Sequence, residues 1–93
     1  MLGRYSESIT LLEKCLRYRR KHYFYKNLGD SYFFLGIHEK AVANYERAVR
    51  LDPGFDEAFY NLAVCQFFQE EFVSAGFNIA EALKMDSSNE TYL

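Results

Sequence analysis

The stretch YKNLGDSYFFLGIHEKAVANYERAVRLDP, residues 25–53, decides the fold, because a related stretch, FYNLAVCQFFQEEFVSAGFNIAEALKMDS, follows at residues 59–87. Aligning the sequence with itself at an offset of 34 residues gives identities at these pairs: Asn27 and Asn61, Leu28 and Leu62, Phe33 and Phe67, Phe34 and Phe68, Ala41 and Ala75, Asn44 and Asn78, Ala48 and Ala82, Asp52 and Asp86. Apolar residues recur every three or four positions in both copies, which indicates helices and not strands. The period therefore predicts an all-α repeat protein.

A period of 34 residues with two helices per copy resembles the tetratricopeptide repeat. The first copy carries the aromatic, small and proline positions of that pattern at Tyr25, Leu28, Gly29, Tyr32, Ala41, Tyr45, Ala48 and Pro53. The second copy departs from the pattern at Gln66, Ile79 and Ser87, and Glu70 replaces the hairpin glycine, Gly36. The resemblance implies an α-solenoid of antiparallel helix-turn-helix hairpins.

The segment from Gly3 to Cys15 matches the second helix of a copy, at a spacing of 33 residues from Gly36 to Ala48. We expect a single domain over residues 1–93. It comprises the second helix of an incomplete repeat (1–21), two full repeats (22–55 and 56–89) and the start of a further helix (90–93). Five helices are predicted near residues 5–18, 22–35, 38–51, 56–69 and 72–85. Both ends are unfinished in repeat terms, so we expect a fragment of a longer array or a protomer that pairs.

Small residues are expected to let the helices approach while larger ones fill the space between them. Cys15 aligns with Ala48, and Cys65 lies beside Ala63, so both cysteines are predicted to pack as small hydrophobes. Pro53 is expected to end a hairpin, and Asp56 stands where a cap for the next helix would be useful.

The composition of the chain limits the kinds of partner that it is expected to bind. The net charge is -2 with both signs interspersed, and no apolar run approaches the roughly 20 residues that cross a bilayer. Two cysteines without CxxC spacing fit a reducing compartment. We therefore expect a cytoplasmic protein, with the nucleus left open, that has no leader and binds neither membrane nor nucleic acid.

The one basic cluster is interpreted as a solvated connector with cations at a helix end: Arg17, Arg19, Arg20, Lys21 and Lys26.

No catalytic arrangement emerges from the sequence. His22 and His38 are placed at different hairpin corners, and there is no metal-ligand pair at helical spacing and no phosphate loop. We predict no enzyme activity, no cofactor and no metal site.

In the tetratricopeptide family the first helix of each hairpin lines a concave face, so the resemblance implies a binding groove on these helices. In this sequence the groove positions are Tyr23, Lys26, Asn27, Asp30, Phe33, Phe34, Glu57, Tyr60, Asn61, Val64, Phe67 and Phe68. The aromatic members are candidates to anchor a partner segment. Phe33 and Phe67 are equally candidates for packing between their own helices, an alternative that the sequence favours.

Asn27 and Asn61 recur at one place in consecutive hairpins, where amides could hold a peptide backbone. Similar asparagines line the repeats of O-linked N-acetylglucosamine transferases and the carboxylate clamps of co-chaperones. Lys26 and Asn61 fit that clamp, but Asp30 stands where an asparagine belongs and Thr91 stands at the first basic site of the third hairpin. A complete carboxylate clamp is therefore rejected.

Three hypotheses for the function follow from the resemblance and from the unfinished ends. The leading hypothesis is an interaction module or scaffold that binds a protein or peptide in the concave groove. A second is a structural segment that self-associates through its unfinished ends, giving a homo-oligomer. A third is the substrate-selecting repeat region of a larger enzyme.

Overall fold

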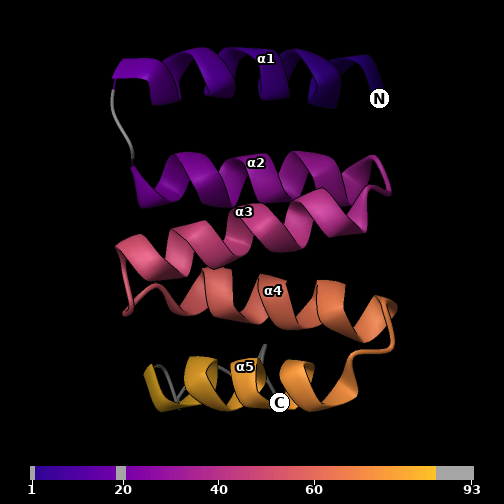
Figure 1. The fold of residues 1–93 in the computed structure, drawn as a ribbon, viewed down its shortest axis with the longest axis vertical. Coiled ribbons are helices and arrows are strands. Elements are labelled where there is room, and N and C mark those ends of the chain that lie inside the picture. The colour runs from indigo at the N-terminus through magenta and orange to yellow at the C-terminus, as the bar shows by residue number, and fades with distance from the viewer. Residues whose placement is uncertain (1, 19–20, 86–93) are drawn as a thin grey trace.

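The protein forms five antiparallel α-helices stacked in chain order (Figure 1), seen in a computed structural model that describes residues 2–18 and 21–85. The helices are α1 (Leu2–Tyr18), α2 (His22–Phe34), α3 (His38–Leu51), α4 (Asp56–Phe68) and α5 (Phe72–Met85). The described residues contain no strand. An α-solenoid of about five helices is therefore confirmed, although α1 begins three residues earlier than predicted. The predicted helix start at residues 90–93, like Arg19 and Arg20, lies outside the described residues.

Each hairpin closes through the same backbone hydrogen bonds. After α2 the amide of Gly36 donates to the carbonyl of Phe33 at 2.9 Å, and Gly36 takes a φ of 80°. After α4 the amide of Glu70 donates to the carbonyl of Phe67 at 3.0 Å, with a φ of 61°. The left-handed conformation suits glycine and is unfavourable for glutamate. The second hairpin thus keeps the geometry of the first with a less suitable residue.

The turn between the two full repeats is held by Asp52 and not by a helix cap. The Asp52 carboxylate accepts a hydrogen bond from the amide of Gly54 at 3.0 Å. The capping position of α4 is Phe55, which has no side-chain cap hydrogen bond, and Asp56 is the first helical residue. The expected cap at Asp56 is therefore wrong by one position, although its carboxylate stands in the first turn, where negative charge is favourable.

The core interleaves small and large side chains as the repeat pattern predicted. One cluster of buried residues joins α2, α3 and α4 through Tyr25, Leu28, Ala48 and Ala58. A second contains Ala41, Tyr45, Leu62 and Cys65. At Gly29 the helices approach closely, since an added Cβ would lie 2.5 Å from the ring of Tyr45.

The two cysteines differ in environment. Cys65 is fully buried, as predicted, whereas Cys15 is exposed. The prediction for Cys15 is wrong because the helices around it differ from those around its counterpart, Ala48. Ala48 packs between α2 and α4, whereas α1 packs mainly on α2. Both are free thiols.

Candidate interaction groove

The first helices of the two full repeats, α2 and α4, flank a hollow of about 360 Å³ that we call the groove. Its lining is mainly aromatic and includes residues from three helices: Asp30, Phe33, Phe34, Tyr45, Tyr60, Asn61 and Val64. Six of these seven side chains stand at positions predicted for the concave face. The seventh, Tyr45, is a buried core residue of α3 that also borders the hollow.

Asp30 is the centre of the polar contacts in the groove. Its Oδ1 accepts hydrogen bonds from the Tyr45 hydroxyl at 2.5 Å and from Asn61 Nδ2 at 3.1 Å. Its Oδ2 lies 2.8 Å from the Lys26 ammonium, one helical turn earlier. A half-buried carboxylate is stabilised only when its oxygens are paired in this way. Asp30 therefore ties α2, α3 and α4 together at the floor of the groove.

Lys26 bridges two acids. Its ammonium lies 2.8 Å from Asp30 and 2.9 Å from Glu57, so it joins α2 to α4. Burial lowers the pKa of Lys26, but the hydrogen bonds and charges of Asp30 and Glu57 outweigh that effect and the pKa is raised above 10.5. The lysine remains charged and its charge is already balanced by carboxylates of the chain itself.

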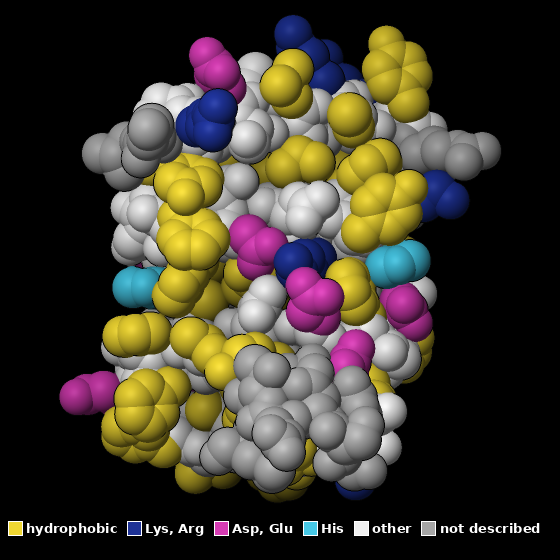
Figure 2. All heavy atoms as spheres, turned by 180° about the vertical axis from the view of Figure 1, so that it is seen from behind, with side chains coloured by type: hydrophobic (Ala, Val, Ile, Leu, Met, Phe, Trp, Pro, Cys, Tyr) yellow, Lys and Arg dark blue, Asp and Glu magenta, His cyan; other side chains and the backbone are white. Residues whose placement is uncertain are grey.

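Aromatic rings continue from the groove along the side of the stack where the hairpins turn. Phe34 stacks on Tyr5, and Phe68 stacks on His38, with ring centroids 5.2 Å and 5.7 Å apart. Phe33 joins the two pairs through contacts with Phe34 and Phe68 at 5.5 Å and 5.9 Å. Hydrophobic side chains form a column along one edge of the molecule (Figure 2). We call this series of rings the aromatic edge.

The alternative that packs Phe33 and Phe67 between their own helices has a different outcome for the two residues. Phe33 is half-buried and packs against the second core cluster while also lining the groove. Phe67 is 60% exposed, and its ring lies 5.3 Å from that of Phe72, so it packs between the ends of its own helices, α4 and α5, but outside the buried core. Phe34 and Phe68, at 58% and 61% exposure, are available on the surface.

The structure does not bring the remaining predicted positions together in the groove. Tyr23 is exposed near the start of α2 and contacts His22 and Phe24, away from the hollow. Asn27 is exposed, whereas Asn61 is engaged with Asp30. The two asparagines are therefore not equivalent, and they do not form a repeated pair of amides along the groove.

Sequence reasoning missed Tyr5, His38 and the polar role of Tyr45. The signal for the first two was present in the repeat alignment, because both residues stand two positions after the hairpin glycine and both carry rings. No local signal marks the contact between Tyr45 and Asp30, since it depends on how α3 packs against α2.

The described residues contain no group of three or more histidine, cysteine or acidic side chains placed to hold a metal ion. Within the same residues, no helix has the length and apolar character needed to span a bilayer.

Its stacked helical hairpins, with a groove on the first helix of each full repeat, make this chain a helical-repeat protein of the solenoid class. Residues 24–69 match the family model described as TPR repeat, and the chain therefore belongs to the tetratricopeptide repeat family. It is similar to human Tetratricopeptide repeat protein 6, with 31% identity over 70 residues, covering 75% of this chain and 14% of that protein.

The chain is also similar to a second curated protein and to a solved structure. Photosystem I assembly protein Ycf3 of Acaryochloris marina is 31% identical over 81 residues, covering 87% of this chain and 47% of that protein. The first TPR of Spaghetti (RPAP3), solved bound to the HSP90 peptide SRMEEVD, superposes with a TM-score of 0.93 at 20% identity, covering 97% of this chain and 72% of that one. The chain spans less than half the length of either of these curated relatives.

Proposed function

We propose that this chain is a protein-interaction module whose groove binds a partner segment through an inserted apolar side chain. The observation that carries the proposal is the combination of aromatic walls with a polar floor whose groups are paired with one another. Such a floor offers few unsatisfied groups to a charged or polar ligand. The walls formed by Phe34, Tyr60 and Val64 offer apolar contact area instead.

The electrostatics of the groove argue against an anionic ligand. The solved neighbour holds an HSP90 peptide that contains two glutamates and an aspartate, SRMEEVD. In this chain Lys26 is paired with Asp30 and Glu57, so a peptide carboxylate would have to compete with both acids. We expect weak binding of an acidic peptide end and favour a neutral or basic segment with an apolar anchor.

Affinity capture from a native cell extract tests the groove. The chain with Phe34→Ala and Val64→Ala is compared with the unmodified chain and with Leu11→Ala, a control that also removes exposed apolar surface. Leu11 is 61% exposed on α1 and does not line the groove. We expect the groove variant to lose the captured partner while the control retains it, with all proteins folded by circular dichroism. Equal capture by the groove variant would reject the groove as the binding surface.

A second function is favoured by one observation, the apolar outer face of α5. Phe72, Val73 and Phe77 are exposed there, Val73 by 77%. A contiguous apolar face of this kind commonly contacts another helix. We propose self-association or packing on further repeats through this face, and the test is sedimentation velocity of the chain with and without Val73→Glu. A concentration-independent monomer in both samples would exclude self-association.

As part of the same proposal we place the module in the cytoplasm or nucleus, where its two free thiols would stay reduced. The absence of enzyme activity belongs to this proposal as well.

A further inference from the structure

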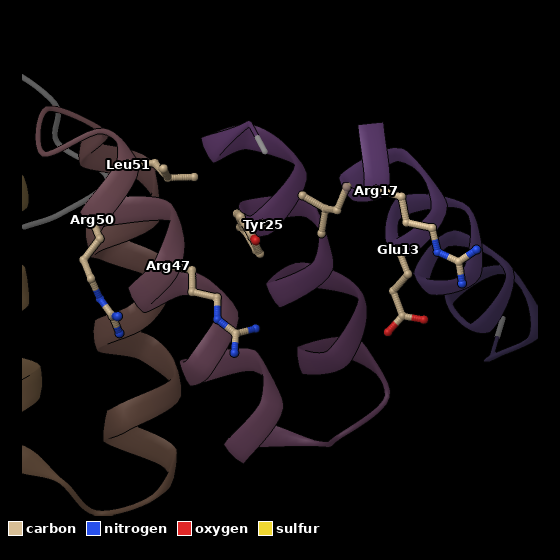
Figure 3. A pocket seen from close by; sticks show the side chains of 7 residues that line it. Glu13, Arg17, Tyr25, Arg47, Arg50 and Leu51 are labelled. Carbon is tan, nitrogen blue, oxygen red and sulfur yellow. The ribbon is translucent and has the colours of Figure 1, made fainter. Parts of the chain in front are cut away.

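A separate hollow of about 610 Å³ lies between α1 and α3, beside α2 (Figure 3). Its lining residues, which we call the arginine crevice, are Glu13, Leu16, Arg17, Tyr25, Arg47, Arg50 and Leu51. An adjoining hollow of about 430 Å³ shares Glu13, Leu16, Tyr25 and Arg47 and adds Lys40. The crevice and the groove use different sides of α2, since Tyr25 lines the first and Asp30 and Phe33 line the second.

The crevice is basic in a chain whose overall charge is negative. Arg17, Arg47 and Arg50 line it together with a single acid, Glu13. Among the ion pairs of the described residues none involves these three guanidinium groups, in contrast with Lys26 in the groove. Arg47 instead lies over the ring of Tyr25, with its Cζ 5.9 Å from the ring centroid. The three arginines therefore have hydrogen-bonding capacity available for carboxylates.

The floor of the crevice is apolar. Leu16 and Tyr25 pack in the first core cluster, and Leu51 adds a side chain that is 49% exposed. Figure 3 shows Tyr25 between the side chains of α1 and those of α3. A ligand that matches this surface needs an apolar side chain for the floor and acidic groups for the rim.

We propose that the arginine crevice binds an acidic segment of a partner protein, independently of the groove. An apolar side chain of that segment rests on Leu16 and Leu51, and its carboxylates meet Arg17, Arg47 and Arg50. The planar guanidinium forms two parallel hydrogen bonds to a carboxylate, which makes arginine well suited to such recognition.

An acidic protein segment fits the crevice better than nucleic acid does. Single-stranded nucleic acid needs accessible ring faces on which bases stack. Tyr25 is only 9% exposed and its ring already has Arg47 above it, so it cannot serve as a stacking platform. Glu13 would also repel a phosphate chain, whereas a peptide can place a neutral residue opposite it.

The test uses a fluorescein-labelled peptide in which glutamates alternate with leucines, and a matched peptide with lysine in place of each glutamate. Binding to the full chain is measured by fluorescence anisotropy and mapped by amide chemical shifts of the isotopically labelled protein. The crevice variant carries Arg47→Gln and Arg50→Gln. The control carries Arg4→Gln and Lys14→Gln, which removes the same charge from exposed positions outside the crevice.

We expect the acidic peptide to bind and the lysine peptide not to bind, with shifts centred on α1 and α3. Loss of two exposed charge pairs should weaken binding of the acidic peptide about tenfold in the crevice variant. The control should change it by about twofold or less, because screened charges outside the site act weakly. Phe34→Ala should leave it unchanged, so failure of the groove proposal would not imitate failure here.

Several results would overturn the proposal. These are no binding of the acidic peptide to the unmodified chain, equal weakening in the control, or shifts confined to the groove. Displacement of the peptide by a single-stranded oligonucleotide with the same dependence on Arg47 and Arg50 would assign the crevice to nucleic acid instead. Competition by self-association of the chain, seen in sedimentation, would assign it to a second copy.

Discussion

The imidazole of His38 lies parallel to the ring of Phe68, with centroids 5.7 Å apart and planes 7° apart. Tyr5 stacks on Phe34 in the same manner, at 5.2 Å and 19°. In both cases a ring near the start of a second helix covers the last residue of the first helix in the following hairpin. The same stack therefore joins successive hairpins twice, once with tyrosine and once with histidine.

Replacing His38 with alanine should lower the free energy of unfolding by about 0.5–1.5 kcal/mol, the usual contribution of a ring pair beyond its buried area. His38→Tyr should restore most of the loss, because tyrosine performs the same role at position 5. Urea denaturation followed by circular dichroism measures both variants. Glu39→Ala, an exposed neighbour, is the control, and a loss of the same size there would show that the effect belongs to the helix start and not to the ring.

Gly29 is required by the ring of Tyr45. Gly29→Ala should destabilise the protein by about 1–3 kcal/mol, because the new Cβ would lie 2.5 Å from that ring and neither helix can easily move. Gly76→Ala, in α5, has no atom within 4 Å of its added Cβ and should stabilise by about 0.5–1 kcal/mol through lower backbone entropy of the unfolded chain.

The second repeat suggests how to relieve this clash. Ala63 and Ile79 stand at the positions of Gly29 and Tyr45, so a larger residue on one helix accompanies a smaller one on the other. The double variant Gly29→Ala with Tyr45→Ile should lose less stability than the sum of the two single variants. Simple additivity in the same urea experiment would contradict a steric origin.

Much of the fold could be predicted because its determinants are local. The bounds of α2 to α5 agree with the predicted ones to within one residue at every end, since the helical period and the turns at Gly36 and Pro53 are encoded in adjacent residues. Cys15 could not be placed, because its exposure depends on which helices pack against α1. A repeat alignment assigns every copy the same neighbours, and that assumption fails here.

The groove could be predicted only in part. Its helices and most of its lining follow from the period, but Asp30 accepts hydrogen bonds from residues 15 and 31 positions away. The arginine crevice likewise gathers Arg17 with Arg47 and Arg50, while Lys26, placed in the same basic cluster as Arg17 on sequence, lies on the groove side. Such groupings depend on tertiary packing and leave no local pattern.

Glu70 gives a test of backbone strain. Its φ of 61° is unfavourable for a residue with a Cβ, so Glu70→Gly should stabilise the protein by about 1 kcal/mol. The neighbouring Glu71→Gly serves as the control and should give no such gain. Among the described non-glycine residues, Glu70 is the one with a positive φ. Thermal denaturation of both variants measures the difference, and equal midpoints would show that the turn is not strained.

The two thiols should react at very different rates. Cys15 is exposed, whereas Cys65 is fully buried and its pKa is raised to about 12, first by burial and then by the charge of Asp30. Iodoacetamide should modify the folded chain once, at Cys15, and Cys15→Ser should remain unmodified until urea is added. Mass spectrometry of the intact protein counts the adducts, and modification of Cys65 in the folded chain would contradict its burial.

Stability should fall as the solution becomes alkaline. The pKa of Cys65 rises from 9.0 to about 12 on folding, and the pKa of Tyr45 is raised by burial and by its hydrogen bond to Asp30. For a thiol with a raised pKa, the unfolded chain loses its proton first as pH increases. The contribution of Cys65 is therefore constant below about pH 9 and is lost between about pH 9 and the folded pKa of about 12.

Cys65→Ala separates this contribution from the others. In urea titrations at about pH 8 and about pH 10.5, the unmodified chain should lose about 1–2 kcal/mol more than the variant, given about 1.4 kcal/mol per pKa unit. The raised pKa values of Tyr45 and Lys26 act in the same direction, so the variant should retain a shallower alkaline decline. Cys15→Ser is the matched control, because it removes an exposed thiol and should leave the full pH dependence in place. If Cys65→Ala and Cys15→Ser showed the same dependence as the unmodified chain, the buried thiol would not be the group whose ionisation opposes the fold.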